Sequence, residues 1–363
     1  MRVLRITFVL PGYPWRPVGG FRVVYEYANH LAARGHTVTV VHPRQLSNWP
    51  PEARHLRQRA RGKALFWRDL ILRPPVDWQP LDERVQMLYV PEPTAEHVPD
   101  GDAVFATAWQ TAAYVAGYTA SKGRKFYLVQ DFYPYLGSES QIANTWRFPL
   151  RKVAVSSWLC GMVVQSGIAP HDISVIPNGV DQQRFRLQEN ISTRSRRIAM
   201  MYSDSDHKAA GDGVSALETC KCAHPDLQAI VFGAARRRPA LPRWIEYAGR
   251  VAEERLVLIY NRSSIFLSSS IAEGFALPPA EAMACGCAVV ATDSGGIREY
   301  ARHEMTALLS PAGDRQALAA NALRLLADDS LRIRLAQAGH SHIKKFTWEV
   351  ATNKIEQLLL ASA

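Results

Sequence analysis

The spacing of apolar residues changes twice between residues 4 and 41. Residues 4–10 are mostly apolar and predict a buried strand. The i, i+3, i+4, i+7 spacing of one helix face follows at Val24, Tyr27, Ala28 and Leu31. Gly35 is typical of a helix end, and residues 37–41 form a second strand-like run. The order strand, helix, strand predicts two parallel strands joined by a right-handed crossover.

Short apolar runs alternate with helical stretches along the rest of the chain. They predict strands at residues 85–90, 103–106, 126–130, 153–156, 173–181 (ending in a turn), 198–202, 228–232, 265–268, 288–291 and 306–309. Helices are expected between them, with two or three closing the chain from Arg315 to Leu360. The polar, irregular stretch Leu187–Arg196 is expected to link two halves. We therefore expect two doubly wound α/β domains facing each other across a cleft, with ligands at the carboxyl ends of the strands.

Composition narrows the class of protein. The 363 residues are enough for two domains, and 47% hydrophobic with 21% charged residues is ordinary for a globular chain. A net charge of +10 favours anionic partners such as nucleotides, phosphorylated lipids, nucleic acid or a membrane surface, without choosing among them. No apolar run reaches the roughly 18 residues that a transmembrane helix needs, so none is expected.

The cysteines bear on the compartment. There are five, an odd number, and a chain of this size needs no disulfide, so we expect a reducing cytoplasm. Two Cys-x-Cys pairs lack further His or Cys pairs at zinc-finger spacing, which favours buried thiols over a zinc site.

The strongest chemical signal is the stretch Ser270–Gly286, which leaves a buried strand, passes through a loop and opens a helix. Two prolines suit the first turn of that helix, and the glycine at position 286 suits its end. These features predict that Glu273 lies in the loop and Glu281 in the first helical turn.

The backbone between these glutamates is predicted to bind an anion, because helix N-termini present free amides. Here those amides belong to Gly274, Phe275, Ala276 and Leu277. A carboxylate accepts two hydroxyl protons at once, and sugars carry neighbouring hydroxyls. The pattern therefore predicts a phosphate held between two sugar-binding acids, Glu273 and Glu281. The alternative is a solvated Glu273 and a Glu281 that serves only the helix dipole.

In the setting Glu-Gly-Phe-x-Leu-Pro-x-x-Glu-Ala-Met-Ala-x-Gly, the two glutamates resemble those of glycosyltransferase family 4. Further segments carry the same resemblance: residues 176–181 with Phe185, residues 289–292 with Gly295, Gly296 and Glu299, and residues 346–348. The resemblance covers almost the whole chain and is strongest over residues 173–350.

The resemblance implies a retaining sugar transferase with the two-Rossmann GT-B fold. Residues 1–186 would form the acceptor domain and residues 187–345 the domain that binds a nucleotide-sugar donor. Residues 346–363 would form a helix that packs back on the first domain.

Individual roles also follow from the resemblance. Glu273 would hold hydroxyls of the transferred sugar, and Glu281 would hold the ribose hydroxyls. Backbone amides near the sugar and phosphates would come from Phe275, Ala276 and Leu277. Val251 falls where the family's backbone holds the base. Gly19 and Gly20 fall where its glycine-rich loop meets the diphosphate, and absent side chains do let a backbone approach closely. A plain strand-to-helix turn is the alternative for these glycines.

One departure from the family concerns the leaving diphosphate. The family places an Arg and a Lys five residues apart at the start of the second domain's first helix. Lys208 matches the Lys, but Ser203 stands where the Arg is expected. Serine cannot replace the fixed fork of a guanidinium. Either another cation serves, such as one in the run Arg236–Arg238, or the phosphate is held more weakly. Lys208 as a solvated surface lysine is the alternative.

A second departure lies in the first domain, where the strand at residues 126–129 ends in Gln130-Asp131 instead of the family's His-Asp-like pair. Glutamine cannot act as a base. Asp131 either orients the acceptor or sugar, or caps the loop. This variant resembles some bacterial polysaccharide transferases, rhamnose-transferring ones among them.

Two further segments leave alternatives open. Asp204-Ser-Asp206 spells the Asp-x-Asp that holds a divalent metal in other sugar transferases, but the resemblance implies a fold that requires no metal or cofactor. The basic stretch Arg54–Arg73, interleaved with apolar residues, is either an amphipathic surface helix or a contact for an anionic membrane, a phosphorylated acceptor or nucleic acid.

The expected function is metal-independent transfer of a hexosyl unit to a glycan, a lipid-linked saccharide or a small molecule. Lys208, Glu273 and Asp131 are the expected catalytic residues, and nucleic acid is not an expected partner. The expected location is the cytoplasm, and peripheral attachment to the inner face of the membrane is the alternative. Alternatives are an inactive nucleotide-sugar or nucleic-acid binding protein, or a nucleotide-sugar epimerase of the same fold.

Overall fold

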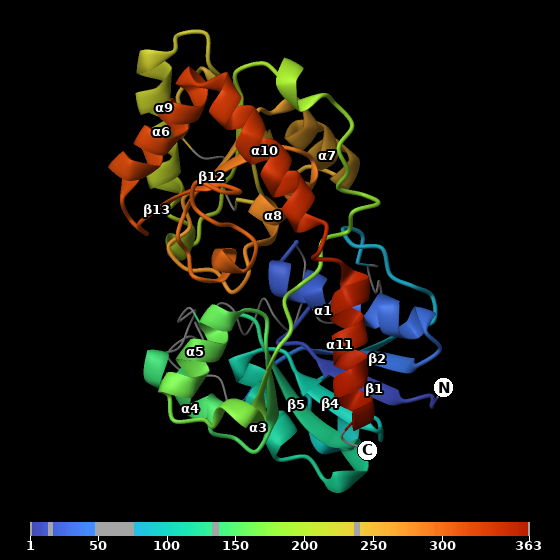
Figure 1. Ribbon diagram of the computed structural model, residues 1–363. Helices are drawn as coiled ribbons and strands as arrows, with labels where there is room; N and C mark the ends of the chain where they lie inside the picture. The colour runs from blue at the N-terminus through green and yellow to red at the C-terminus, as the bar shows by residue number, and fades with distance from the viewer. Residues whose placement is uncertain (1, 14–16, 48–75, 133–137, 236–239, 362–363) are drawn as a thin grey trace. The chain divides into compact units, whose positions relative to one another are not determined.

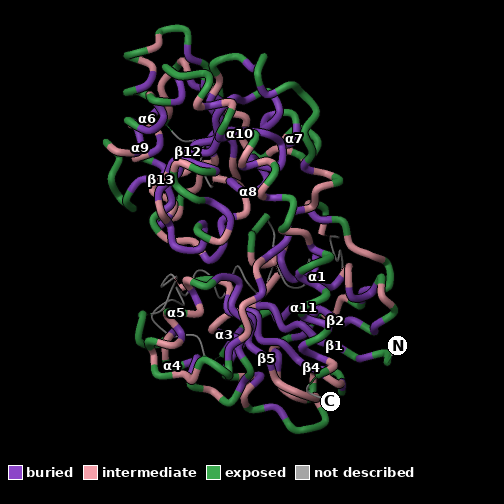
Figure 2. The backbone as a smooth tube through the Cα atoms, in the orientation of Figure 1, coloured by how far each residue is buried: buried purple, intermediate pink, exposed green. Residues whose placement is uncertain are grey.

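The computed structural model describes residues 2–13, 17–47, 76–132, 138–235 and 240–361 (Figure 1). The chain forms two compact units. The N-terminal unit is Met1–Ile176 together with Thr352–Ala363, and the C-terminal unit is Pro177–Ala351. Each unit is built on one parallel sheet, whose strands are largely buried (Figure 2).

The N-terminal sheet has the order β3-β2-β1-β4-β5-β6-β7. Its strands are β1 (Arg5–Val9), β2 (Thr37–Pro43), β3 (Gln86–Val90), β4 (Ala103–Ala106), β5 (Arg124–Val129), β6 (Arg151–Ala154) and β7 (Ile173–Val175). All neighbours are parallel, and β1 pairs with β2 on one side and β4 on the other. The strand order therefore reverses between β1 and β4, where doubly wound sheets bind ligands.

Helices of the N-terminal unit connect these strands. They are α1 (Gly19–Ala33), α3 (Trp109–Ala116), α4 (Glu139–Trp146), α5 (Ser157–Gln165) and the short η2 (Ala95–His97), η3 (Ala120–Lys122) and η4 (Pro170–Asp172). The last helix, α11 (Trp348–Ala361), returns to this unit (Figure 1). Its Glu356 accepts hydrogen bonds from Arg34 Nη1 at 2.6 Å and His36 Nε2 at 2.9 Å. The final helix thus packs on the first domain's residues through a buried carboxylate.

The C-terminal sheet has the order β10-β9-β8-β11-β12-β13, again parallel throughout. Its strands are β8 (Arg197–Met201), β9 (Gln228–Phe232), β10 (Ile245–Gly249), β11 (Ile265–Ser268), β12 (Ala288–Thr292) and β13 (Leu308–Ser310). Its helices are α6 (Ala210–Ala223), α7 (Glu253–Arg262), α8 (Leu277–Ala284), α9 (Arg315–Ala327), α10 (Asp329–Ile343) and the short η5 (Ile191–Thr193), η6 (Asp206–Lys208) and η7 (Gly296–Glu299). The strand order here reverses between β8 and β11.

The expected strands are all present, and the described residues include one further strand that the apolar pattern did not predict. Strand β10 lies at the edge of its sheet, and of its residues only Ile245 is buried, so it leaves no apolar run in the sequence. The stretch expected to be a linker packs into the C-terminal unit, because Ile191 and Arg194 are buried. The Arg194 guanidinium donates to main-chain oxygens of Tyr260, Ser263 and Cys285, which satisfies most of its buried donors.

Candidate functional site

Lys208 and Glu273 meet at the reversal point of the C-terminal sheet. Lys208 closes η6 in the loop after β8, and Glu273 lies in the loop after β11. Lys208 Nζ donates a hydrogen bond to Glu273 Oε1, and both side chains are less than one-fifth exposed. The residues are 65 positions apart in the sequence and come together because parallel neighbouring strands end at the same edge.

Further hydrogen bonds tie the two loops together. Ser269 Oγ donates to the Lys208 carbonyl at 3.0 Å, and the Ile271 amide donates to the His207 carbonyl at 2.7 Å. The pKa of His207 is lowered to about 4, mainly by burial and also by the neighbouring Lys208 charge, while Glu273 opposes the shift. His207 is therefore neutral near pH 7, and Lys208 is the positive group at this position.

The loop from Glu273 to α8 is fixed by a close backbone crossing. The Glu273 amide donates to Ser294 O at 2.9 Å, and the Gly296 amide donates to Glu273 O at 3.0 Å. A Cβ atom at Gly296 would lie 2.0 Å from Gly274 O, so only glycine fits there. The loop backbone is therefore held at a defined distance from β12 and the turn that follows it.

Tyr300 and Ala276 hold the second half of this loop. Tyr300 Oη donates to the Ala276 carbonyl at 2.5 Å, and Phe275 packs on the Tyr300 ring at 5.2 Å between centroids. Ala276 has φ of 64°, a left-handed conformation that costs free energy for any residue except glycine. Such strain is often found where a backbone is shaped for a ligand.

The amides predicted to bind an anion are available for that role. Within the described part of the chain, no residue accepts a hydrogen bond from the amides of Gly274, Phe275, Ala276 or Leu277. They precede or open α8, so they add to the positive end of its dipole. Anion binding by this segment stays a prediction.

The position of Glu281 corrects one expectation. Helix α8 begins at Leu277 and has no acidic residue in its first turn, so Glu281 lies in the second turn. The prolines that suggested the helix start fall at its second and third residues. Because the dipole effect fades beyond the first turn, a role limited to the dipole is disfavoured. Glu281 is only 4% exposed, and Tyr260 Oη donates to its Oε2 at 3.3 Å.

Ser203 lies on the same loop as Lys208. Its hydroxyl accepts from the Ser205 amide at 3.3 Å, and it contributes no charge. Ala209, which follows Lys208, has φ of 42°, a conformation in which glycine would be unstrained. The run Arg236–Arg238, named as a substitute cation, lies outside the described residues.

Val251 lies two residues beyond the carboxyl end of β10 and is half-buried. Gly249, the last residue of β10, has φ of 65° and turns the chain out of the sheet. Since β10 pairs with β9 and β9 with β8, Val251 lies at the same edge of the sheet as Lys208 but farther from the reversal point.

The predicted glycines of the N-terminal unit lie at that unit's own reversal point. Helix α1 begins at Gly19, and a Cβ atom at Gly20 would lie 3.5 Å from Gln130 Nε2. Gln130 Nε2 donates to Thr107 O at 3.0 Å, while its buried Oε1 has no partner within the described residues. Asp131, next in sequence, is exposed. The loops after β1, β4 and β5 thus meet here.

Sequence reasoning missed two residues of the C-terminal site, Tyr260 and Tyr300. Tyr260 lies on a helix face whose sequence pattern indicates only burial in the core, and Tyr300 follows a short 3₁₀ helix. The available signal is that both are fully buried tyrosines, whose hydroxyls need partners.

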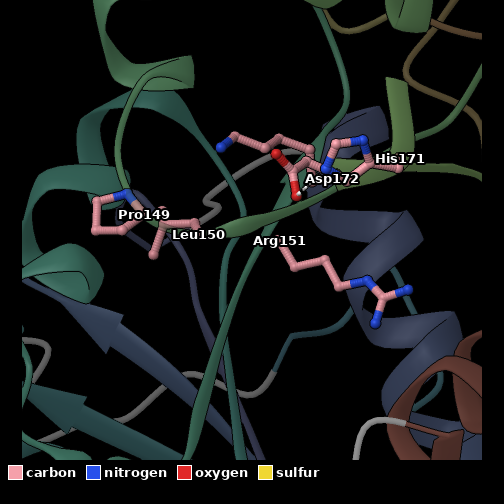
Figure 3. A pocket seen from close by; sticks show the side chains of 6 residues that line it. Pro149, Leu150, Arg151, His171 and Asp172 are labelled. Carbon is pink, nitrogen blue, oxygen red and sulfur yellow. Dashed lines mark ion pairs between the residues drawn. The ribbon is translucent and has the colours of Figure 1, made fainter. Parts of the chain in front are cut away.

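A hollow elsewhere in the N-terminal unit contains none of the predicted residues. It lies at the amino ends of β6 and β7 and is lined by Pro149, Leu150, Arg151, Lys152, His171 and Asp172. His171 Nε2 and Asp172 Oδ1 are 3.8 Å apart, and Arg151 extends away from them (Figure 3). This is the opposite edge of the sheet from Gly19 and Gly20.

Other expectations concern metals, membranes and the basic stretch. Residues 54–73 lie outside the described residues. Across the ranges that the structure describes, no group of three or more His, Cys, Asp or Glu is placed to hold a metal ion. In the same ranges, no helix has the length and apolarity needed to cross a bilayer.

Two family models together match most of the chain. The family described as Glycosyltransferase Family 4 matches residues 18–184, and the family described as Glycosyl transferases group 1 matches residues 181–342. The two matches meet at the junction between the N-terminal and C-terminal sheets.

Curated relatives match over shorter stretches. The chain is 35% identical to O-antigen chain mannosyltransferase B of Escherichia coli over 31% of its length and 29% of that protein. It is 27% identical to a phosphatidyl-myo-inositol mannosyltransferase of Mycobacterium leprae over 51% of its length and 52% of that protein. The matched stretches thus span about half or less of these relatives.

Solved structures match over the full fold. The Anabaena protein HepE, in complex with UDP-glucose, has a TM-score of 0.74 at 17% identity, covering 99% of this chain and all of that one. Sucrose-phosphate synthase of Thermosynechococcus elongatus also gives 0.74 at 17% identity, with both chains fully covered. These likenesses confirm the GT-B class of fold with its two Rossmann-like domains.

Proposed function

The chain belongs to glycosyltransferase family 4, and we propose that it transfers a hexosyl unit from a nucleotide-diphosphate sugar to an acceptor hydroxyl, with retention of the anomeric configuration. The observation that supports this best is the group at the reversal point of the C-terminal sheet. A lysine, a carboxylate and a row of amides without partners among the described residues converge there. These are the groups that a sugar diphosphate requires.

Each group has a role in the proposed reaction. Lys208 and the amides of residues 274–277 stabilise the negative charge that grows on the leaving diphosphate. Glu273 accepts hydrogen bonds from hydroxyls of the transferred sugar, and Glu281 accepts those of the ribose. Gly19 and Gly20 let the N-terminal backbone approach the diphosphate. Val251 contributes backbone contacts to the base.

The acceptor hydroxyl attacks from the face that the nucleotide leaves, and a phosphate oxygen takes its proton. This path retains configuration without a protein base, which suits a chain whose Gln130 cannot accept a proton. Asp131, exposed beside it, orients the acceptor. No metal is required, because Lys208 and the amides supply the positive potential that a divalent cation supplies elsewhere.

The relatives support a saccharide or a lipid-linked glycan as the acceptor, since their names include an O-antigen chain and a phosphatidyl-myo-inositol acceptor. The net charge of +10 supports contact with an anionic surface on the cytoplasmic side of a membrane. The basic stretch Arg54–Arg73 is the segment we propose for that contact.

The test is release of nucleoside diphosphate that depends on an added acceptor, after thermal-shift screening with UDP, GDP and dTDP selects the nucleotide. We expect the purified chain to turn over with EDTA present. Full activity in a Glu273→Ala variant would contradict the assignment. Nucleotide binding without turnover would favour an inactive sugar-nucleotide binding protein, the alternative that Ser203 and Gln130 leave open.

A further inference from the structure

Tyr260 contacts the carboxylate of Glu281 from a neighbouring helix. Its hydroxyl donates to Glu281 Oε2 at 3.3 Å, across the interface of α7 and α8. Tyr260 is fully buried and Glu281 is 4% exposed, so this bond is shielded from solvent. A hydrogen bond to a buried carboxylate is stronger than one in water and restricts the orientation of the acid.

The position of Tyr260 is itself fixed on several sides. Its ring packs edge-on against Phe232 and Phe266, with centroids 5.8 and 5.6 Å away. Its carbonyl accepts from Arg194 Nη1 at 3.3 Å, and Arg194 Nη2 donates to the Cys285 carbonyl at 2.7 Å. The guanidinium therefore joins the end of α7 to the end of α8. These contacts fix the positions of α7, which carries Tyr260, and α8, which carries Glu281, relative to each other.

We propose that Tyr260 is a positioning residue that orients Glu281 for the ribose hydroxyls of the donor nucleotide, and so contributes to selection of ribonucleotides over deoxyribonucleotides. The inference rests on the proposed function, because it takes Glu281 as the ribose ligand. Holding Oε2 from α7 fixes the plane of the carboxylate before the donor arrives. A ligand that meets a preorganised acid loses less conformational freedom on binding.

The test is a set of dissociation constants for the full chain. Isothermal titration calorimetry measures UDP and GDP together with their 2′-deoxy and 3′-deoxy forms, against the wild-type chain and Tyr260→Phe. The phenylalanine keeps the ring among its aromatic neighbours and removes only the hydroxyl. Tyr118→Phe is the matched control, because it removes a buried hydroxyl that donates to Pro93 O in the N-terminal unit.

We expect the wild-type chain to bind its ribonucleotide about tenfold or more tightly than the deoxy forms, as for a hydrogen bond to a charged group. Tyr260→Phe should weaken ribonucleotide binding about fivefold to tenfold and leave the deoxy forms within about twofold, so that the preference shrinks. Tyr118→Phe should leave the preference intact.

An equal loss for both nucleotide forms in Tyr260→Phe, or no loss at all, would overturn the positioning role. The proposed function fails in a different way, since the wild-type chain would then bind none of these nucleotides and would not bind dTDP in the thermal-shift screen either. A wild-type chain that binds ribo and deoxy forms equally would remove Glu281 as the ribose ligand, and the inference with it, while leaving the donor site in place.

Discussion

Lys208 and Glu273 form an ion pair that joins the two loops at the reversal point of the C-terminal sheet. Both are proposed ligands of the same donor, one for its phosphates and one for its sugar. Without a ligand the two side chains pair with each other, and this pairing compensates the cost of burying a charged lysine and a charged carboxylate. Donor binding must therefore exchange this contact for contacts with the diphosphate and the sugar hydroxyls.

Lys208→Ala should lower kcat/KM by about 10²-fold or more, because the residue at position 203 is uncharged and cannot stabilise the leaving diphosphate in its place. The measurement is steady-state transfer at several donor concentrations. Lys354→Ala, an exposed lysine on α11, is the matched control and should change nothing. Transfer by Lys208→Ala at the wild-type rate would exclude a role for this lysine in charge stabilisation.

Gly296→Ala should damage the donor loop. The new Cβ would lie 2.0 Å from Gly274 O and 2.6 Å from Glu273 O, and both are backbone atoms. We expect the free energy of unfolding of the C-terminal unit to fall by about 3 kcal/mol, as for overpacking, together with loss of nucleotide binding. Urea denaturation and thermal shift with nucleotide measure the two effects.

Gly211→Ala provides the comparison for this substitution. A Cβ atom at Gly211, in α6, meets nothing within 4 Å. Alanine also favours a helix over glycine by up to about 1 kcal/mol. The two alanine variants should therefore change stability in opposite directions, and similar losses in both would show that the backbone crossing at Gly296 is not the cause.

The apolar pattern predicts the sheets well, because strands buried on both faces are apolar runs. The bounds expected for β4, β9 and β11 coincide with those observed. It fails for β10, an edge strand with one buried residue. Edge strands need no continuous apolar run, so their sequence resembles that of a loop.

The sequence predicts which residues lie near the ends of the strands, but it does not predict which of their side chains contact one another. Glu273 and Lys208 could be placed at strand ends, which meet at one edge of a parallel sheet. Their direct pairing depends on loop conformations that residue types do not determine. The contact of Tyr260 with Glu281 depends on how α7 packs against α8, and no local pattern encodes that. The second-turn position of Glu281 depends on the residue at which α8 begins.

Acid should destabilise the chain through His42, a buried histidine in β2. Burial lowers the pKa of His42 to about 4, against 6.5 in the unfolded chain, although a hydrogen bond to Gly12 O opposes the shift. Between these pH values the unfolded state binds the proton that the folded state does not. Stability therefore falls as pH drops from 6.5 towards 4, by about 2 kcal/mol at pH 5.

The measurement for His42 is urea denaturation at pH 7 and pH 5. His42→Gln can still donate to Gly12 O but does not titrate, so its loss between the two pH values should be about 2 kcal/mol smaller. His171→Gln, whose side chain is 83% exposed in the native protein, should leave that difference unchanged. Equal pH dependence in the wild-type chain and His42→Gln would rule out this histidine as a source of acid sensitivity.

Glu356 should anchor α11 to the N-terminal unit. His36 Nδ1 accepts from the Leu4 amide at 3.1 Å, so its Nε2 carries the proton that is donated to Glu356. Burial raises the pKa of Glu356, but the bonds from His36 and Arg34 outweigh it, so the pKa lies below its usual value. A lowered pKa means that the carboxylate stabilises the fold above the unfolded pKa and loses that effect as pH falls through the folded one.

Glu356→Ala leaves the Arg34 guanidinium and the buried His36 without this partner, which should cost about 3 kcal/mol. Hydrogen exchange should show faster opening of α11 and of β1, whose sheet receives the helix. Glu349→Gln, on an exposed position of the same helix, should exchange like the wild-type chain. If α11 amides in Glu356→Ala stay as protected as before, apolar contacts of residues such as Ile355 and Leu359 hold the helix, and the buried carboxylate contributes little.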